Sequence, residues 1–236
     1  MNLKLAMPVA LRTFLVPRTV RRSFDTPGTI GKQTLLSLLN SQPTIIEIGT
    51  HVGTDTQQLA HAFPKGKIFG FEPHPHLFSK ATKSVKKFKN VTLIPAALSN
   101  VSGFQIFRQS SGTSDGSGSL LKASNHFPYP TVHFLEQDEV IVAVSTLDKF
   151  LEKALITNVD LIWIDAQGPE GLVFDGAART LKLTQYVYCE VATVPEYEGA
   201  SPYSLIKSTL AQYNLHPIKE FMPTSWHGSG NVLFGR

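Results

Sequence analysis

The chain has 236 residues, of which 42% are hydrophobic and 17% are charged, and its formal net charge is +4. This composition excludes a disordered chain, and the length suits one α/β domain with a full core. The single cysteine, Cys189, excludes a disulfide within the chain and is expected to be a buried thiol. No apolar run approaches the roughly 20 residues of a transmembrane helix. The charge excess is small and no arginine-rich helix accompanies it, so we expect no nucleic-acid partner.

The N-terminal residues differ from the rest, and we predict an extension (residues 1–27) before one domain (residues 28–236). Apolar and basic residues are mixed in the extension, and Pro8 and Pro17 break any long helix. It lacks the unbroken apolar stretch and the small-residue cleavage site of a secretory signal, so we expect a cytoplasmic protein. The extension either packs on the domain and frays, which we favour, or makes a peripheral contact with a membrane surface or an acceptor.

Strand and helix patterns alternate along the rest of the chain. The expected helices cover residues 29–39, 54–63, 76–88, 146–155, 170–174 and 202–213. The expected strands cover residues 45–48, 67–71, 91–95, 104–107, 140–144, 161–164, 186–191, 216–221 and 231–234. The last two strands are joined by a polar loop that contains glycine, so we expect them to form a hairpin. Such alternation predicts an α/β fold with a mostly parallel sheet, helices on both faces and an antiparallel C-terminal hairpin.

One segment, residues 110–139, breaks this alternation. It begins with the serine- and glycine-rich sequence SSGTSDGSGS. A loop of this length inside a compact domain is usually functional or disordered. It follows the third strand on the side where ligands bind, so it is either a lid or a surface insertion without a role. We expect Ser119, which precedes two leucines, to belong to its ordered part.

The sequence TIIEIGTHVGTDT predicts a strand that runs through a glycine turn into a helix, which is where open α/β sheets bind nucleotide-like ligands. Gly49 and Gly53 lie in this turn, with His51 where a middle glycine often stands. The turn therefore lacks the closer glycine spacing that a pyrophosphate requires. Glu72 ends the next strand, where an acid accepts hydrogen bonds from ribose hydroxyls. Glu47 would place a carboxylate near a sulfonium, so the turn favours S-adenosylmethionine over NAD. A glycine turn in another α/β protein is the alternative.

Several motifs, taken in order, resemble those of the FkbM-type methyltransferases, a family of S-adenosylmethionine-dependent enzymes that mostly methylate hydroxyl groups. The likeness extends over residues 45–234 and rests on the sequences IIEIGTHVGTDT, FGFEPHP, VTLIPAALSN, SGSLL, VSTLDKFL and VDLIWIDAQGPEGLVFDGA. The last of these is the most distinctive, and its family positions are occupied by Asp165, Gln167, Gly168 and Glu170. This chain departs from the family at two sites: His51 replaces a usual asparagine, and Trp163 stands where many members have lysine.

The resemblance implies a Rossmann-like class I methyltransferase fold with a seven-stranded sheet and S-adenosylmethionine as cofactor. The residues that would bind the cofactor are Glu47, Gly49, His51, Gly53, Glu72, Pro73, Ala96, Ala97, Ser119 and Asp165. It also implies a hydroxyl acceptor on a sugar, a glycolipid or another secondary metabolite. A non-catalytic protein that binds S-adenosylmethionine and an NAD-dependent oxidoreductase are the alternatives.

Three acids are expected at the rim of the sheet, where a base would help an alcohol to displace the methyl group. Asp165 ends a buried strand, Glu170 begins the next helix, and Glu190 ends the following strand. Clustered carboxylates push one pKa upward, and they also bind divalent metals. We predict that Asp165 lies nearest the methyl group and that Glu170 or Glu190 is the base or a ligand of Mg²⁺, which Asp165 and Glu190 would hold. Alternatively, Glu170 stabilises a helix N-terminus and Asp165 caps a turn.

Other polar and aromatic residues leave the choice of base and acceptor contacts open. His126, His133 and His227 lie in expected loops near the rim and are alternative bases. Trp226 and Tyr197 either stack on a sugar ring or pack in the core.

Overall fold

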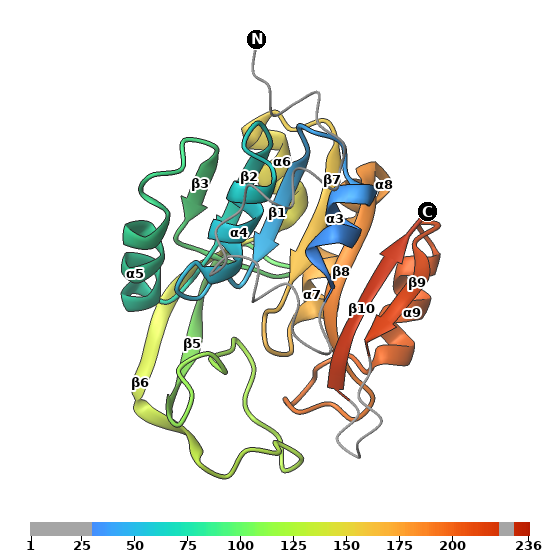
Figure 1. Ribbon diagram of the computed structural model, residues 1–236. Coiled ribbons are helices and arrows are strands. Elements are labelled where there is room, and N and C mark those ends of the chain that lie inside the picture. Colours follow the sequence, from blue (N-terminus) through green and yellow to red (C-terminus); the bar gives the residue numbers. More distant parts are fainter. Residues whose placement is uncertain (1–29, 222–228) are drawn as a thin grey trace.

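A seven-stranded sheet with the order β3-β2-β1-β7-β8-β10-β9 organises the computed structural model, which describes residues 30–221 and 229–236 (Figure 1). Its strands are β1 (Thr44–Ile48), β2 (Lys67–Phe71), β3 (Val91–Ile94), β7 (Val159–Ile164), β8 (Thr184–Ala192), β9 (His216–Phe221) and β10 (Ser229–Gly235). The first five in sheet order are parallel, and β10 is antiparallel to both of its neighbours. The predicted fold class is therefore confirmed. The predicted extension, together with Trp226 and His227, lies outside the described residues.

Helices cover both faces of this sheet because the central strands are apolar on both faces. They are α3 (Lys32–Leu38), α4 (Thr54–Ala62), α5 (Pro75–Val85), α6 (Leu147–Ala154), α7 (Glu170–Asp175), α8 (Ala178–Leu183) and α9 (Tyr203–Ala211). In β1, Ile45 packs with α3 and α4, whereas its neighbour Ile46 packs in the core formed with α6, α7, α8 and α9. Cys189 in β8 is fully buried in the second of these cores, as predicted. None of the described helices has the length and apolar character needed to cross a bilayer.

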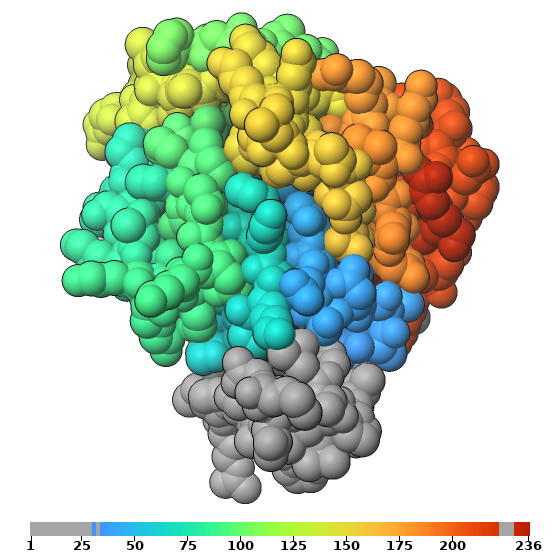
Figure 2. Space-filling view, turned by 90° about the horizontal axis from the view of Figure 1, so that it is seen from above, coloured from blue at the N-terminus to red at the C-terminus, as the bar shows by residue number. Residues whose placement is uncertain are grey.

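The two ends of the sheet lie at opposite sides of the molecule. Seen from above, the C-terminal strands (red) form one edge, and the segment that includes α5 (green) lies toward the other (Figure 2). The parallel strands place their carboxyl ends together, at the bottom of Figure 1. Ligands of open α/β sheets bind outside these carboxyl ends.

A second sheet, with the order β4-β6-β5, consists of β4 (Ala97–Leu98), β5 (Gly103–Gly112) and β6 (Val132–Ser145). The strands predicted at residues 104–107 and 140–144 belong to it, but the ribbon is much longer than predicted. Ser110 and Gly112 pair with Phe134 and Val132, after a register shift that follows Arg108. Backbone hydrogen bonds form this ladder, so it tolerates the serines and glycine that suggested a loop. The ribbon reaches past the carboxyl ends of the parallel strands (Figure 1).

Helix α8 has no counterpart among the predicted elements because its capping group is distant in sequence. Its N-cap residue, Ala177, provides no side-chain hydrogen bond. The carboxylate of Asp148, in the first turn of α6, instead accepts hydrogen bonds from the backbone N–H groups of Arg179 (2.9 Å) and Thr180 (2.7 Å). A carboxylate at this position satisfies helix N–H groups as a local cap would.

Candidate active site

The turn between β1 and α4 owes its shape to glycine. Gly49 has φ +91°, and a Cβ atom there would lie 1.9 Å from the carbonyl oxygen of Asp165. Gly53 has φ +84° at the N-cap of α4, and a Cβ atom there would lie 2.4 Å from Ser84 Oγ in α5. His51 also adopts a left-handed backbone, with φ +50°. Gly49 thus allows β1 and β7 to approach, whereas Gly53 allows α4 to pack on α5.

This turn forms one wall of a cavity of about 260 Å³ at the carboxyl ends of β1, β2 and β7. Eight of the predicted cofactor-binding residues line the cavity, namely Glu47, Gly49, His51, Glu72, Pro73, Ala96, Ala97 and Asp165. Gly53 and Ser119 are not among the lining residues. Ser119 is fully buried and its hydroxyl accepts a hydrogen bond from the Leu121 N–H (3.0 Å), while its neighbours Gly118 and Leu120 face the cavity.

Glu72, the predicted ribose-binding acid, is held at the cavity wall by the backbone. Its two carboxylate oxygens accept hydrogen bonds from the N–H groups of His51 (2.8 Å) and His74 (2.9 Å). Burial raises the pKa of Glu72 to about 7, although these two hydrogen bonds act in the opposite direction. Each carboxylate oxygen has a second lone pair, so both remain able to accept a bond from a ligand hydroxyl.

Glu47 is a buried acid with unused hydrogen-bonding capacity. Its side chain lines the cavity at 1% exposure, and its Oε2 atom has no hydrogen-bond partner among the described residues. Burial and the nearby carboxylate of Asp55 raise the pKa of Glu47 to about 8. A buried polar atom without a partner is costly unless a ligand satisfies it. Asp55 also lines the cavity, although it was not among the predicted site residues. Burial and the nearby Asp165 carboxylate raise the pKa of Asp55 to about 6. Its position in the first turn of α4 was the signal in the sequence that could have identified it.

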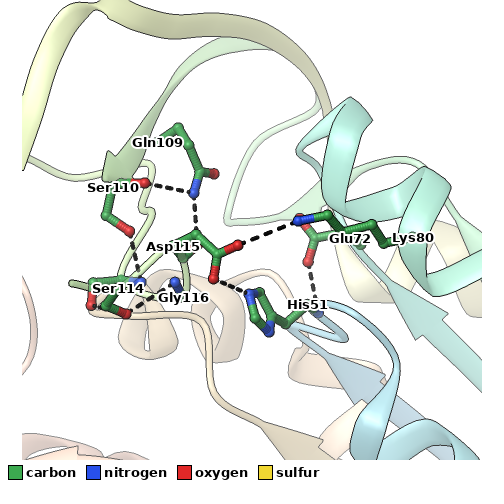
Figure 3. Close-up of polar contacts among 9 residues, drawn as sticks. His51, Glu72, Lys80, Gln109, Ser110, Ser114, Asp115 and Gly116 are labelled. Atoms are coloured by element: carbon green, nitrogen blue, oxygen red, sulfur yellow. Dashed lines mark hydrogen bonds and ion pairs between the residues drawn. The ribbon is translucent and has the colours of Figure 1, made fainter. Parts of the chain in front are cut away.

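Part of the long loop closes over the cavity, and Figure 3 shows how it is held. We call residues 113–131 the cover loop. Asp115 contacts His51 Nε2 (2.9 Å) through Oδ1 and Lys80 Nζ (3.6 Å) through Oδ2. The Gln109 side chain donates to the backbone oxygen of Asp115 (2.6 Å). Although partial burial opposes it, the hydrogen bond and charge of His51, together with Lys80, hold the pKa of Asp115 below its usual value. The loop thus borders the cavity, and its role as a lid stays a prediction.

A second set of contacts fastens the cover loop to the segment after β8. The Ser124 N–H donates to the backbone oxygen of Glu196 (2.9 Å), and the Glu198 N–H donates to that of Lys122 (2.8 Å). Tyr197 is 3% exposed, and its hydroxyl donates to the backbone oxygen of Ser117 (2.8 Å). Tyr197 therefore packs in the structure and anchors the loop.

The predicted acids Asp165 and Glu190 come together at the ends of β7 and β8. These strands are parallel neighbours, with Ile164 beside Cys189 in the register, so the next residues adjoin. The side-chain amide of Gln167 donates to Asp165 Oδ1 and to Glu190 Oε2 (2.9 Å). The Asp165 carboxylate, followed by burial, raises the pKa of Glu190 well above its usual value.

Glu170 occupies a different position from these two acids. Its carboxylate accepts hydrogen bonds from the backbone N–H groups of Ala166 (2.9 Å) and Gly168 (3.0 Å), and its side chain is buried. Burial raises its pKa to about 7. The bonds hold a turn in which Gln167 and Gly168 have φ +61° and +111°. Glu170 therefore fixes the turn that carries Gln167, and a direct role in proton transfer stays a prediction.

The other candidate bases and the metal site find less support in the geometry. His126 and His133 are exposed and do not line the cavity. Within residues 30–221 and 229–236, no three His, Cys, Asp or Glu side chains are grouped as metal ligands. A Mg²⁺ ion held by Asp165 and Glu190 stays a hypothesis.

Comparisons with known proteins agree with this geometry. Residues 47–222 match the model of the methyltransferase FkbM domain. The chain is 31% identical over 188 residues to the 2-O-methyltransferase NoeI of Sinorhizobium fredii, covering 77% of this chain and 76% of that protein. The crystal structure of methyltransferase FkbM from Methylobacillus flagellatus matches with a TM-score of 0.58 at 9% identity, over 96% of this chain and 50% of that one. The chain thus spans half the length of that protein.

A further match is to fibrillarin from Aeropyrum pernix with natively bound S-adenosyl-L-methionine, with a TM-score of 0.50 at 15% identity, over 92% of this chain and 76% of that one. The fold and the sequence matches together define an S-adenosylmethionine-dependent methyltransferase. The chain belongs to the FkbM methyltransferase family. The oxidoreductase alternative is therefore set aside.

Proposed function

We propose that the protein transfers a methyl group from S-adenosylmethionine to a hydroxyl oxygen. The observation that carries this proposal is the pair formed by Asp165 and Glu190 beside the cavity, because a carboxylate with a raised pKa suits proton abstraction from an alcohol. The relative that is a 2-O-methyltransferase supports oxygen as the methylated atom.

The cavity fits the cofactor in its chemistry as well as its position. Glu72 offers two free lone pairs to ribose hydroxyls, Ala96 and Ala97 provide small apolar walls, and Glu47 offers an unpaired oxygen. When bound, S-adenosylmethionine supplies a methyl group already activated on a sulfonium. The remaining task of the protein is to position the acceptor and to take up its proton.

Glu190 is the proposed base, and Asp165 is the positioning acid that keeps the pKa of Glu190 high. The hydroxyl proton passes to a Glu190 carboxylate oxygen as the acceptor oxygen is methylated. Gln167 holds both carboxylates in place through its two N–H bonds. We propose a hydroxyl of a sugar, a glycolipid or a secondary metabolite as the acceptor, because this class follows from the family likeness.

The first test is calorimetric titration with S-adenosylmethionine, S-adenosylhomocysteine and NAD, repeated with Glu72→Ala. We expect micromolar binding of the two adenosyl ligands, loss of that binding in the variant, and no binding of NAD. Failure of both adenosyl ligands to bind would contradict the proposal.

Catalysis is tested separately, by methyl transfer from labelled S-adenosylmethionine to a panel of hydroxyl compounds, with Mg²⁺ or with a chelator. We expect Glu190→Gln to lower kcat by about 100-fold or more while cofactor affinity changes little, because only the base is lost. Binding without transfer to any compound would instead favour the non-catalytic alternative. Full turnover by Asp165→Asn would show that the Asp165 carboxylate has no role in catalysis.

A further inference from the structure

The second sheet has an open edge along the first half of β5. This strand is an outer strand of its sheet, with β6 on one side. On the other side, the Arg108 N–H donates to the backbone oxygen of Ser119 (2.8 Å), and the Ser119 N–H donates to that of Arg108 (3.0 Å). Among the described residues, no strand pairs with residues 103–107 on this side. Five residues of β5 therefore present an unpaired edge.

The bonds of Arg108 show which backbone groups point outward at this edge. In an antiparallel ladder, the N–H and C=O groups of successive residues point alternately to the two sides of the strand. Arg108 stands opposite Glu139 of β6 in the register but bonds to Ser119, so its groups point away from β6. The register runs without a shift from the start of β5 to Arg108. The N–H and C=O groups of Phe104 and Ile106 therefore also point away from β6.

The same two residues carry exposed apolar side chains. Phe104 is 78% exposed and Ile106 is 44% exposed. Their register partners on β6, Ala143 and Ile141, are exposed on the same face, Ile141 at 75%. The sequence has no Lys, Arg, Asp or Glu in residues 99–107. An exposed apolar edge without charge or proline is a template for pairing with another chain.

The other outer strands of the two described sheets lack this combination. β9 contains Pro217, Lys219 and Glu220, and both proline and charged side chains disfavour the addition of a further strand. β3 and β4 are only four and two residues long, so they offer few backbone groups to a partner. The open edge of β5 is thus the one that is built for pairing.

This edge is complementary to itself. It is bounded at one end by Ser119 and at the other by residues 99–102, which cross the end of β6 on the way from β4. Two antiparallel copies therefore fit with their Gln105 residues opposite each other, at the centre of the edge. Phe104 then lies opposite Ile106 of the second copy, and the two such pairs exchange four N–H···O=C bonds. Aromatic and β-branched side chains in directly opposite positions stabilise a sheet, and no like charges meet.

We propose that two copies of this chain associate through the open edges of β5, about a two-fold axis at Gln105, and join their three-stranded sheets into one sheet of six strands. Such a contact uses the same surface on both copies, as two-fold dimers do. The paired edge is short and buries less than the roughly 1,200–2,000 Å² of a stable interface, so the dimer is reversible, with a micromolar Kd. Phe107 and Gln109 of the same strand line the cofactor cavity, so the contact lies beside both sites. The inference does not depend on the proposed function.

Sedimentation equilibrium of the full chain tests the association, and we expect a reversible monomer–dimer equilibrium. Phe104→Lys combined with Ile106→Lys should weaken the dimer by about 30-fold or more, because like charges would stand opposite each other. Phe104→Lys combined with Ile106→Glu should stay within about fivefold of the wild type, because each lysine would then face a glutamate. Ile218→Lys is the matched control, since Ile218 is a half-exposed isoleucine on the outer strand β9, and it should have no effect.

A cross-link tests the register. Opposite residues of a pair without hydrogen bonds have Cα atoms about 4.5 Å apart, which suits a disulfide. Oxidation should therefore link Gln105→Cys into covalent dimers, whereas Phe104→Cys, whose two copies are not opposite each other, should link poorly. The wild type is the control, because its single cysteine, Cys189, is buried.

Three results would overturn the proposal: a monomer at all concentrations, a dimer unaffected by the double-lysine variant, or equal cross-linking at positions 104 and 105. A monomer that binds phosphatidylcholine vesicles, and loses that binding in the double-lysine variant, would assign the edge to a membrane surface instead. Thermal unfolding and calorimetry with S-adenosylhomocysteine, applied to each variant, distinguish loss of the fold or of the cofactor site from loss of association.

Discussion

The β1–α4 turn and the cover loop both border the cofactor cavity, but they are held in different ways. The turn is fixed by backbone: Gly49 meets the carbonyl oxygen of Asp165, and the His51 N–H binds Glu72. The cover loop is held at one end by the exposed ion pairs of Asp115. At the other end it is held by the buried hydroxyl of Tyr197 and by backbone hydrogen bonds to the segment after β8. Close backbone contacts of this kind permit little movement, whereas exposed side-chain ion pairs are weak and reversible. We therefore expect a rigid turn and a cover loop that is more mobile at its Asp115 end.

The largest expected effect comes from Gly49→Ala. The new Cβ atom meets a backbone oxygen at 1.9 Å in a left-handed conformation, so we expect a loss of about 3 kcal/mol or more in unfolding free energy and loss of cofactor binding. Gly199→Ala is the matched control, because Gly199 also has φ +77° but nothing lies within 4 Å of the added atom. We expect it to cost about 1 kcal/mol by backbone strain alone. If chemical denaturation showed equal losses of unfolding free energy for the two variants, the close contact at Gly49 would not be what fixes the turn.

The acids of the two regions should respond to pH in opposite directions. The pKa values of Glu47 (about 8) and Glu72 (about 7) lie above the ordinary 4.5, so between pH 5 and 7 the folded protein binds more protons than the unfolded chain. Stability of the cofactor-free protein should therefore fall as pH rises, by about 1 kcal/mol per pH unit for each group.

Glu47→Gln should make this slope shallower in denaturation at pH 5, 6 and 7. Asp115→Asn should leave it unchanged, because the pKa of Asp115 is lowered and its contribution is lost only as pH falls below this range. A slope of the opposite sign would contradict the burial of the two glutamates.

Tyr197→Phe tests the buried anchor of the cover loop. It removes the hydrogen bond to the Ser117 oxygen and leaves a buried acceptor unpaired, which costs about 1 to 2 kcal/mol. Tyr213→Phe is the control, because the Tyr213 ring is partly buried against the core formed with α6, α7, α8 and α9. We expect it to lower the unfolding free energy by no more than about 0.5 kcal/mol. Hydrogen exchange should show faster exchange in the cover loop, in the segment after β8 and in the turn that carries Gln167, whose Oε1 atom lies 3.2 Å from the same hydroxyl. Protection unchanged in the loop would show that Tyr197 does not hold it.

The smallest effect is expected for Asp115→Asn. Exposed ion pairs contribute at most about 1 kcal/mol, so cofactor dissociation should accelerate by no more than about fivefold. Added salt should accelerate dissociation from the wild type but not from the variant. Glu136→Gln, on the same ribbon, is the control. A much larger effect would mean that the cover is as rigid as the turn.

The same contrast explains what the sequence could predict. Glu72 and the pairing of Asp165 with Glu190 follow from the rule that parallel strands end at one edge. Asp115 and Gln109 could not be placed, since their partners lie in other elements and no local pattern marks them. Helix α8 was missed for the same reason, because its capping carboxylate comes from α6. The β5–β6 ribbon was underestimated because its end is built from serine and glycine.

The cover loop contacts two parts of the site, since Asp115 lines the cofactor cavity and residues 122–124 are bonded to the segment that follows β8 and the proposed base Glu190. Thermodynamic linkage is reciprocal. If a bound cofactor orders this loop and so tightens acceptor binding by some factor, a bound acceptor must tighten cofactor binding by the same factor. Because the cover loop contacts both parts of the site, each bound ligand would then slow the dissociation of the other until the products leave.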